Sequence, residues 1–302
     1  MKKVFIDGRE GTTGLQIVER LEKMDNIELL TIDEALRKDV SERKKLINSA
    51  DIVFLCLPDA AAKESAALCE NDTTVIIDAS TAHRTNPAWT YGFPELSKEQ
   101  AEAIKKSKRI ANPGCHASGF ISLVYPLVKG GILPSDYPLA CHSITGYSGG
   151  GKKMIADYRE EPLKPGYDSP RQYALGQAHK HLPEMKYICG LDYEPMFSPI
   201  VANFYAGMVV SVPLHARYLK DHMGAKAVWE YMAEYYKDAA AVKVMDFDAA
   251  PAMLDASTMA GRDDMEIYVT GNDERILLAS RFDNLGKGAS GAAVQCMKMI
   301  IE

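Results

Sequence analysis

The chain has 302 residues, of which 47% are hydrophobic and 25% charged, and its formal net charge is −6. This composition is that of an ordinary soluble globular protein, and it excludes a disordered chain, a collagen-like repeat and a coiled coil. A mildly acidic chain also lacks the basic field of a nucleic-acid binder or of a protein that binds anionic membranes.

No apolar run reaches the ~18 residues that a membrane-spanning helix requires. The first residues, MKKVFI, mimic a signal peptide only briefly before Asp7 and Gly8 interrupt the apolar stretch, so a first β-strand is expected there. The thinly spread cysteines contain no CxxC pair, which predicts reduced thiols in a cytoplasmic enzyme and no structural metal site. The six cysteines are Cys56, Cys69, Cys115, Cys141, Cys189 and Cys296.

Strand and helix signals alternate along the first part of the chain. Continuous apolar runs typical of buried strands are separated by segments with helical spacing, a pattern that predicts right-handed βαβ units and a parallel sheet. The expected strands are 3–6, 27–32, 51–57, 74–77 and 110–111, and the expected helices are 13–24, 40–49 and 60–70.

The second part of the chain indicates a different architecture, an α+β domain with a mixed or antiparallel sheet. Expected strands are 139–144, 204–214, 241–245, 265–270 and 275–280, with helices after Cys115 and at 228–236 and a long functional loop at 147–170. The predicted fold class is therefore α/β, with a Rossmann-type parallel-sheet domain at 1–114, completed by a C-terminal helix within 283–302, and a second domain at 115–282.

A glycine-rich turn joins the first strand to the first helix. Gly8, Gly11 and Gly14 form G-x-x-G-x-x-G, a variant of the dinucleotide fingerprint, and a helix N-terminus placed after such a turn can receive a pyrophosphate. Asp33 lies where an acidic group would hold a ribose hydroxyl, whereas Arg37 and the adjacent lysine could face a 2′-phosphate. The two cations favour NADP, with NAD or a solvated helix start as the alternatives.

Cys115 follows Asn112-Pro113-Gly114 and begins a helical pattern. The helix dipole and the free amides of the first turn stabilise a thiolate at this position, and the Pro-Gly turn can aim the side chain into a cleft. A thiolate attacks acyl-phosphate and carbonyl carbons and forms a thioester. The residue pattern therefore predicts that Cys115 is a nucleophile.

The best candidate for the accompanying base is the segment HKHLPE. His179 and His181 point the same way if this segment is extended, and Glu184 could orient one of them. The two histidines could also suggest a metal, but no third ligand has suitable spacing. His116 is a rival base, ranked second because adjacent residues rarely align for proton transfer.

Several segments, taken in order, resemble the shorter form of the N-acetyl-gamma-glutamyl-phosphate reductases, within the semialdehyde dehydrogenase superfamily. His116 departs from the aromatic Phe or Tyr that usually follows the cysteine, and Ala117-Ser118-Gly119 replaces a Pro-Thr-Gly type sequence. The matching segments are FIDGREGTTGLQI, DIVFLCLPD, IIDASTAHR, YGFPEL, ANPGCHASG, GYSGGGK, HKHLPE, FSPIVANF and DNLGKGASGAAVQ.

The resemblance implies an NADPH-dependent reductive dephosphorylation of N-acetyl-gamma-glutamyl phosphate in arginine biosynthesis, through a thioester on Cys115. It implies a homo-oligomer, dimer or tetramer, with a small-molecule substrate. It assigns catalysis to Cys115, His179, His181 and Glu184, without deciding which histidine is the acid/base. It assigns substrate contacts to Arg84, Asn112, Ser148, Gly149 and Tyr173, and cofactor contacts to Gly8, Gly11, Thr12, Thr13, Gly14, Arg37, Leu57, Pro58, Ser80, Thr81, Asn284, Gly286 and Lys287.

Two alternatives remain open from the sequence. One is a related reductase that acts on another acyl phosphate, such as aspartyl phosphate or a carrier-linked aminoadipyl or glutamyl phosphate. The other is a dinucleotide-binding redox sensor without turnover, in which Cys115 is oxidised rather than acylated. The HKHLPE segment disfavours the sensor, because a sensor requires a reactive thiol but no paired acid and base.

Overall fold

The computed structural model describes residues 1–301 and divides into two compact units. Unit 1 comprises Met1–Pro113 together with the chain from Ala289 onward, and unit 2 comprises Gly114–Gly288. The sequence assigned 283–288 to the first unit. The structure groups these residues with unit 2 because the side chains following the last strand bind there: Asp283 accepts a hydrogen bond from the Gly261 amide and Asn284 accepts one from the Gly207 amide.

Unit 1 is built on a six-stranded sheet in which every pairing is parallel, in the order β2-β1-β3-β4-β6-β5. The strands are β1 (Lys2–Asp7), β2 (Ile27–Leu30), β3 (Ile52–Leu55), β4 (Val75–Asp78), β5 (Thr90–Tyr91) and β6 (Arg109–Ala111). The helices are α1 (Thr12–Leu21), α2 (Val40–Ser49), α3 (Asp59–Ala67), α4 (Lys98–Lys106) and α9 (Gly291–Ile301).

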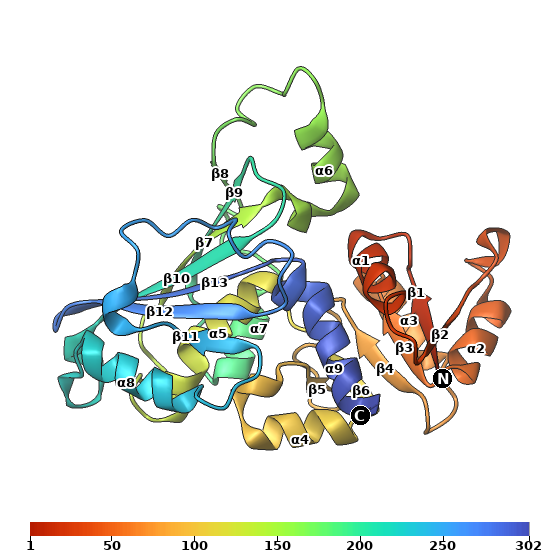
Figure 1. Cartoon of the computed structure of the whole chain (residues 1–302), viewed down its shortest axis with the longest axis horizontal. Coiled ribbons are helices and arrows are strands. Elements are labelled where there is room, and N and C mark those ends of the chain that lie inside the picture. Colours follow the sequence, from red (N-terminus) through yellow and green to blue (C-terminus); the bar gives the residue numbers. More distant parts are fainter. Residues whose placement is uncertain (302) are drawn as a thin grey trace. The chain divides into compact units, whose positions relative to one another are not determined.

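Alternate residues of these strands supply two separate apolar cores, one on each face of the sheet. Val4 and Ile6 of β1 join the core that includes residues of α1, α4 and α9, whereas Phe5 joins the core with residues of α2 and α3. This two-sided burial explains the continuous apolar runs in the sequence, because both faces of each strand exclude water. Figure 1 shows α9 lying along the sheet of unit 1, although it comes from the far end of the chain.

Unit 2 contains a seven-stranded mixed sheet in the order β11-β12-β13-β10-β7-β9-β8, with two parallel pairs among antiparallel ones. Together with unit 1 this confirms the predicted fold class. The strands are β7 (Ala140–Gly146), β8 (Arg171–Gln172), β9 (Met196–Ala202), β10 (Met208–His215), β11 (Val242–Val244), β12 (Met265–Gly271) and β13 (Arg275–Phe282). The helices are α5 (Cys115–Lys129), α6 (Gly151–Arg159), α7 (Leu182–Cys189) and α8 (Ala225–Tyr235).

Helix α5 lies very close to the sheet of unit 2. A Cβ built on Gly119 would stand 2.4 Å from the Val210 Cγ2 atom and 2.9 Å from the Phe282 Cε1 atom. Only a glycine leaves room for this approach, so the strands β10 and β13 fix the position of the helix that begins at Cys115.

The segment 147–170, which the sequence predicts as a long functional loop, is partly helical. It forms a single 3-10 turn at Tyr147–Gly150 and then helix α6, which projects away from the sheet of unit 2 (Figure 1). An aromatic cluster holds the segment together: the rings of Tyr147 and Tyr158 stack with centroids 4.6 Å apart, and the Arg171 guanidinium lies 3.5 Å from the Tyr167 centroid. The prediction of a loop was based on the glycine and proline content of the segment, and it therefore missed this cluster.

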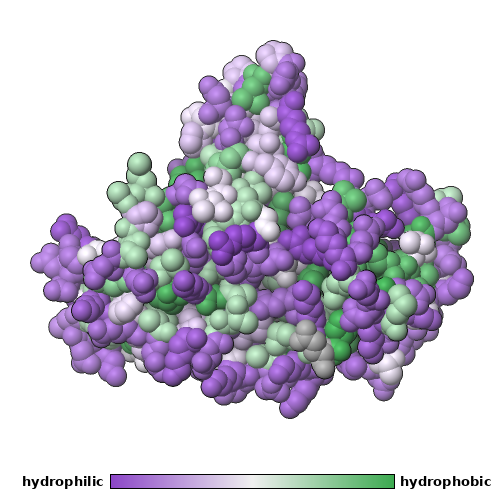
Figure 2. Space-filling view, viewed as in Figure 1, coloured by the Kyte–Doolittle hydropathy of each residue, from purple (hydrophilic) through white to green (hydrophobic). Residues whose placement is uncertain are grey.

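Among residues 1–301, no helix is long and apolar enough to cross a membrane, and no group of three or more His, Cys, Asp or Glu side chains is placed to hold a metal ion. On the face displayed in Figure 2, hydrophilic residues predominate and hydrophobic residues form small areas between them. The apolar side chains of the strands are thus mostly internal.

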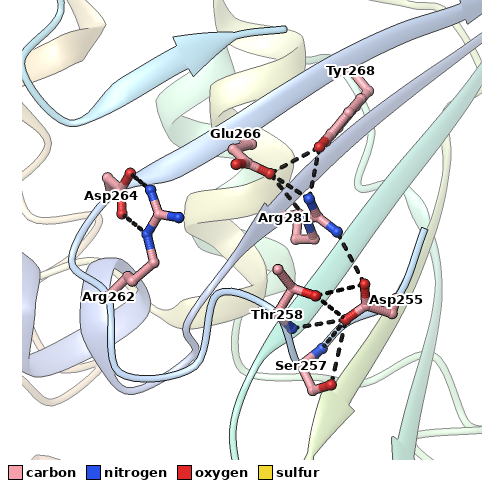
Figure 3. A network of polar contacts seen from close by, with 8 residues as sticks. All are labelled: Asp255, Ser257, Thr258, Arg262, Asp264, Glu266, Tyr268 and Arg281. Carbon is pink, nitrogen blue, oxygen red and sulfur yellow. Dashed lines mark hydrogen bonds and ion pairs between the residues drawn. The ribbon is translucent and has the colours of Figure 1, made fainter. Parts of the chain in front are cut away.

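A network of polar contacts ties the segment before β12 to the outer face of the sheet in unit 2 (Figure 3). Arg281 of β13 is 9% exposed and donates to Glu266 at 2.7 and 3.0 Å, to the Tyr268 hydroxyl at 2.8 Å and to Asp255 at 3.1 Å. Asp255 also accepts hydrogen bonds from the backbone and side chain of Thr258. A buried guanidinium therefore joins two acidic groups that are far apart in the sequence.

Replacement of Arg281 by Met should lower the free energy of unfolding by about 2–4 kcal/mol, because Glu266 would remain half-buried without its cation. Arg262→Met is the matched control, since Arg262 pairs with Asp264 in the same region but both side chains are largely exposed; its expected cost is below ~0.5 kcal/mol. Urea denaturation of both variants measures the difference, and equal costs would refute the importance of the network.

Candidate functional site

The glycine turn of unit 1 has the geometry of a phosphate-binding loop. Gly8 has a φ of +87°, and a Cβ on it would stand 2.3 Å from the carbonyl oxygen of Cys56 at the end of β3. A Cβ on Gly14 would stand 2.6 Å from the Gly8 carbonyl oxygen. Gly11 is the N-cap of α1 and no side chain caps this helix, so the turn presents bare backbone at a helix N-terminus, which suits the diphosphate of a dinucleotide.

A buried ion pair forms at Asp7, the residue directly before this turn. The Asp7 carboxylate, at the end of β1, accepts hydrogen bonds from Arg43 at 2.7 and 3.1 Å and from the Ser65 hydroxyl at 2.5 Å. The negative charge next to the turn is therefore balanced by the guanidinium of α2, and it opposes an incoming diphosphate less than a bare carboxylate would. The contact between Asp7 and Arg43 was not predicted, because the two residues are 36 positions apart.

The remaining residues of unit 1 that the sequence assigned to the cofactor follow the carboxyl ends of neighbouring strands. Leu57 and Pro58 come after β3, and Ser80 and Thr81 come after β4. The Ser80 hydroxyl donates to Asp78 at 2.7 Å. The carboxyl end of a parallel sheet is where dinucleotides bind in folds of this type.

The DASTAHR segment is held rigidly within unit 1. His83 is buried, its Nδ1 lies 2.6 Å from the Asp78 carboxylate, and its ring stacks on Trp89 at a centroid distance of 3.9 Å. Arg84, a predicted substrate residue, is also buried and donates to the carbonyl oxygens of Asn112 at 2.9 Å and Ala79 at 3.1 Å. Arg84 thus joins the ends of β4 and β6, next to the turn that precedes Cys115.

The nucleophile candidate of unit 2 lies at the first residue of α5. Gly114 is the N-cap, and its amide donates a 2.8 Å hydrogen bond to the buried carboxylate of Glu184 in α7. A Cβ on Gly288 would stand 2.9 Å from the Cys115 Cβ, so a second backbone segment approaches the cysteine closely. The α5 N-terminus favours the anionic form of the thiol.

The segment HKHLPE is not extended, which was the condition for the predicted parallel orientation of its two histidines. His181 has helical backbone angles (φ −89°, ψ −10°) as the N-cap of α7, so the segment is not extended. His179 Nδ1 accepts from the His181 amide, and the two rings meet edge-on with centroids 4.8 Å apart. Glu184 binds the Gly114 amide, a role that the sequence could not indicate, because this contact spans 70 positions.

An aromatic and imidazole cluster surrounds the start of α5. The His116 ring centroid lies 5.4 Å from that of His179 and 5.5 Å from that of His181. The Nε2 atom of His116 lies 2.7 Å from the Tyr173 hydroxyl, and its Nδ1 atom lies 2.7 Å from the Ser143 hydroxyl. Ser143 and Gly288 are the two residues here that the sequence did not single out.

Burial keeps two imidazoles of this cluster, those of His116 and His179, neutral. It lowers the pKa of His116 to about 3, with a further contribution from the nearby charges of His179 and Lys180. It also lowers the pKa of His179 to about 4, assisted by Lys180. Burial raises the pKa of Tyr173 well above its usual value, and the charge of Cys115 adds to this effect. The lone pair on Nδ1 of neutral His179 receives the His181 amide, so the proton of this ring lies on Nε2.

The predicted C-terminal cofactor residues and the glycine loop after β7 belong to one hydrogen-bonded group in unit 2. The Asn284 amide donates to the Ser148 hydroxyl at 2.9 Å, and the Asn284 side-chain oxygen accepts from the Gly207 amide at 2.8 Å. A Cβ on Gly149 would stand 3.4 Å from the Asn284 side-chain nitrogen. Two further members of the predicted set, Gly286 and Lys287, are buried in the same segment.

Arg37 is the predicted cofactor residue with the most exposed surroundings. It caps the single 3-10 turn at Glu34–Leu36 and forms a 3.6 Å pair with Glu34, both side chains being largely exposed. The Asp33 carboxylate accepts a hydrogen bond from the Ala35 amide at 2.8 Å. An exposed pair of this kind is weak, so the guanidinium can exchange Glu34 for another anion.

Two family models match the chain, one on each unit. The model described as semialdehyde dehydrogenase, NAD binding domain, matches residues 3–104, and the model described as semialdehyde dehydrogenase, dimerisation domain, matches residues 115–284.

Solved structures of aspartate semialdehyde dehydrogenases share the fold. The enzyme from Francisella tularensis aligns with a TM-score of 0.73 at 15% identity over 100% of both chains. Aspartate semialdehyde dehydrogenase II from Vibrio cholerae also has a TM-score of 0.73, at 16% identity, and covers 100% of this chain and 98% of that one. The class is therefore that of the semialdehyde dehydrogenases, which are oxidoreductases with a nicotinamide dinucleotide domain.

Closer relatives narrow the class. The chain is 45% identical over 302 residues to N-acetyl-gamma-glutamyl-phosphate reductase 2 of Pseudomonas putida, covering 99% of this chain and 96% of the relative. It is also 45% identical over 307 residues to the N-acetyl-gamma-glutamyl-phosphate reductase of a Chelativorans species, covering 99% and 98%. The chain belongs to the N-acetyl-gamma-glutamyl-phosphate reductase family within the semialdehyde dehydrogenases, which confirms the resemblance found in the sequence.

The neutral His116 should make stability depend on pH. Its pKa is near 6.5 in the unfolded chain and about 3 in the folded protein, so the unfolded state binds one more proton between these values. Stability is therefore fully present above pH ~6.5 and falls with decreasing pH, by up to about 1.4 kcal/mol per pH unit from this residue. Urea denaturation between pH 7.5 and 4.5 should give a shallower decline for His116→Phe than for the parent protein. An unchanged slope would contradict the burial of His116 as a neutral group.

Proposed function

We propose that the chain catalyses the NADPH-dependent reduction of N-acetyl-gamma-glutamyl phosphate to N-acetylglutamate 5-semialdehyde and phosphate, a step of arginine biosynthesis. The observation that carries this proposal is the position of Cys115 at the N-terminus of α5. The next residue of that helix, His116, contacts His179, His181 and Tyr173. Relatives with this name and 45% identity over nearly the whole chain support the choice of substrate.

The thiolate of Cys115 attacks the acyl carbon, and the bond between that carbon and the phosphate oxygen breaks. Phosphate leaves and a thioester remains on the cysteine. Backbone amides in the first turn of α5 stabilise the oxyanion of the tetrahedral intermediate. When bound, NADPH supplies the hydride that reduces the acyl group to the aldehyde level. The carbon–sulfur bond then breaks, which releases the aldehyde and restores the thiolate.

One histidine of the HKHLPE segment is proposed to act as the general acid and base of this cycle. A neutral imidazole takes the thiol proton of Cys115 before attack, and either His179 or His181 is a candidate for this role. His116 is excluded, because both of its ring nitrogens are engaged by Ser143 and Tyr173. Arg84, Asn112, Ser148, Gly149 and Tyr173 are proposed to contact the substrate, and Glu184 to hold the turn that carries Cys115.

The cofactor site is proposed on the glycine turn of unit 1. Gly8, Gly11 and the first turn of α1 would hold the diphosphate, with Ser80 and Thr81 near the end of β4 beside it. Asn284, Gly286 and Lys287 are also proposed as cofactor residues, from the resemblance found in the sequence. Arg37 would meet the 2′-phosphate that distinguishes NADP from NAD.

Replacement of Cys115 by Ala should abolish phosphate-dependent reduction of NADP by N-acetylglutamate semialdehyde, with a loss of at least ~10³-fold, because no thioester can form. Cofactor binding, measured by quenching of protein fluorescence, should be retained. Cys141→Ala is the control, since burial raises the pKa of that thiol and keeps it inert. Residual turnover near the parent rate in Cys115→Ala would refute the thioester route.

A substrate panel separates this function from the alternatives. Turnover of the acetylated glutamate semialdehyde, with little turnover of aspartate semialdehyde, is the expected result. The reverse preference would favour a related acyl-phosphate reductase. If no substrate is turned over and none protects Cys115 from iodoacetamide, the chain is a sensor rather than an enzyme.

Replacement of Arg37 by Ala should raise the KM for NADPH about tenfold and leave the KM for NADH unchanged, because one charge-assisted contact to the 2′-phosphate is lost. Lys105→Ala, which removes an exposed lysine paired with Glu102 on α4, is the control. Steady-state kinetics with both cofactors give the comparison. Equal changes for NADPH and NADH would show that Arg37 does not recognise the phosphate.

A further inference from the structure

His116 is connected through both of its ring nitrogens. Nδ1 lies 2.7 Å from the Oγ atom of Ser143 in β7, and Nε2 lies 2.7 Å from the Oη atom of Tyr173, which follows β8. The ring is 3% exposed and also meets Phe197 of β9 edge-on at 5.2 Å. A chain of three polar side chains therefore runs from the sheet of unit 2, through the helix that begins with the nucleophile, to the phenol of Tyr173.

These hydrogen bonds between Ser143, His116 and Tyr173 fix the position of the Tyr173 hydroxyl. Tyr173 comes after the two-residue strand β8, and its amide donates to the Pro199 carbonyl oxygen at 3.0 Å. Within residues 1–301 its phenol makes a side-chain hydrogen bond to His116. His116 directly follows Cys115 at the start of α5, so this bond holds the phenol oxygen 2.7 Å from the residue next to the cysteine.

The neutral state of His116 determines which group donates in each of its two hydrogen bonds. His116 is neutral, so one of its nitrogens carries a proton and the other accepts one. If Ser143 donates to Nδ1, the Nε2–H donates to the Tyr173 oxygen and the phenolic proton stays available to the site. A phenol beside a thiolate gains most by donating, so the order of donation is Ser143 to His116 to Tyr173.

We propose that His116 is a positioning residue, which holds the Tyr173 hydroxyl with its proton directed to the sulfur of Cys115 and to the acyl group that the sulfur receives. The titratable groups around this relay are His179, His181 and Lys180 on the neighbouring segment and Glu184 on α7. The inference rests on the proposed function for its role in turnover, but the reactivity of the thiol tests it without any substrate.

The experiment measures the rate of Cys115 alkylation by iodoacetamide against pH, with site-resolved mass spectrometry. Loss of the phenolic donor makes the thiolate less favourable, so Tyr173→Phe should move the midpoint of alkylation upward by about one pH unit. His116→Phe should move it upward by at least half as much. The double variant should shift no further than Tyr173→Phe alone, because His116 acts through Tyr173.

Two conservative variants separate positioning from packing. The side-chain amide of Gln can occupy the place of Nε2, whereas that of Asn can occupy only the place of Nδ1. His116→Gln should therefore recover at least half of the shift and His116→Asn should not. Circular dichroism and urea denaturation identify any variant that fails to fold, in which case Ser143→Ala tests the relay from its other end with an upward shift of smaller size.

Three results would overturn the proposal: additive shifts in the double variant, a midpoint in His116→Phe equal to that of the parent protein, or equal behaviour of the Gln and Asn variants. These outcomes are distinct from failure of the proposed function. If the relay governs alkylation but N-acetylglutamate semialdehyde is not a substrate, the proposed reaction is wrong and the positioning of Tyr173 stands. If the substrate is turned over, kcat/KM for His116→Phe should fall about tenfold, and by less than twofold in the Tyr173→Phe background.

Discussion

One hydrogen bond, from the amide of Gly114 to the carboxylate of Glu184, organises the reactive part of unit 2. It links the turn before Cys115, the proposed nucleophile, to the helix that follows the two histidines. Both partners are buried, so the contact is shielded from water, and loss of the acceptor would leave a backbone donor unsatisfied. Cys115 and the HKHLPE segment are 64 or more positions apart in the sequence. Their proximity depends on this contact and on the packing of α5 against α7.

In unit 1 the main constraint is electrostatic, because the proposed ligand carries a diphosphate and the chain is acidic. The net charge of −6 offers no general attraction for a diphosphate. The uncapped first turn of α1 is the local group proposed to attract it, and the Arg43 guanidinium compensates the negative charge of the buried Asp7. The strain-free fit of Gly8 and Gly14 at positions where a Cβ would strike a carbonyl oxygen makes this turn possible.

Much of the fold could be predicted from the sequence, because continuous apolar strands and helical spacing are local signals. Strand β9 was missed since Pro199 interrupts its pattern, and α4 was missed because Ile104 is its one buried residue. At the candidate site, the glycine turn and Cys115 were recognisable from position and turn chemistry. The partners of His116 and Glu184 were not, because Ser143, Tyr173 and Gly114 reach them only in the folded chain. Sequence spacing placed the residues of HKHLPE on one extended face, whereas the start of α7 turns them edge to edge.

The missing side chain at Gly119 has a mechanical consequence. Val210 and Phe282 fill the space that a methyl group would need, so α5 packs directly against the sheet. In the proposed reaction, this packing would hold the sulfur of Cys115 in place while the acyl group binds to it and leaves.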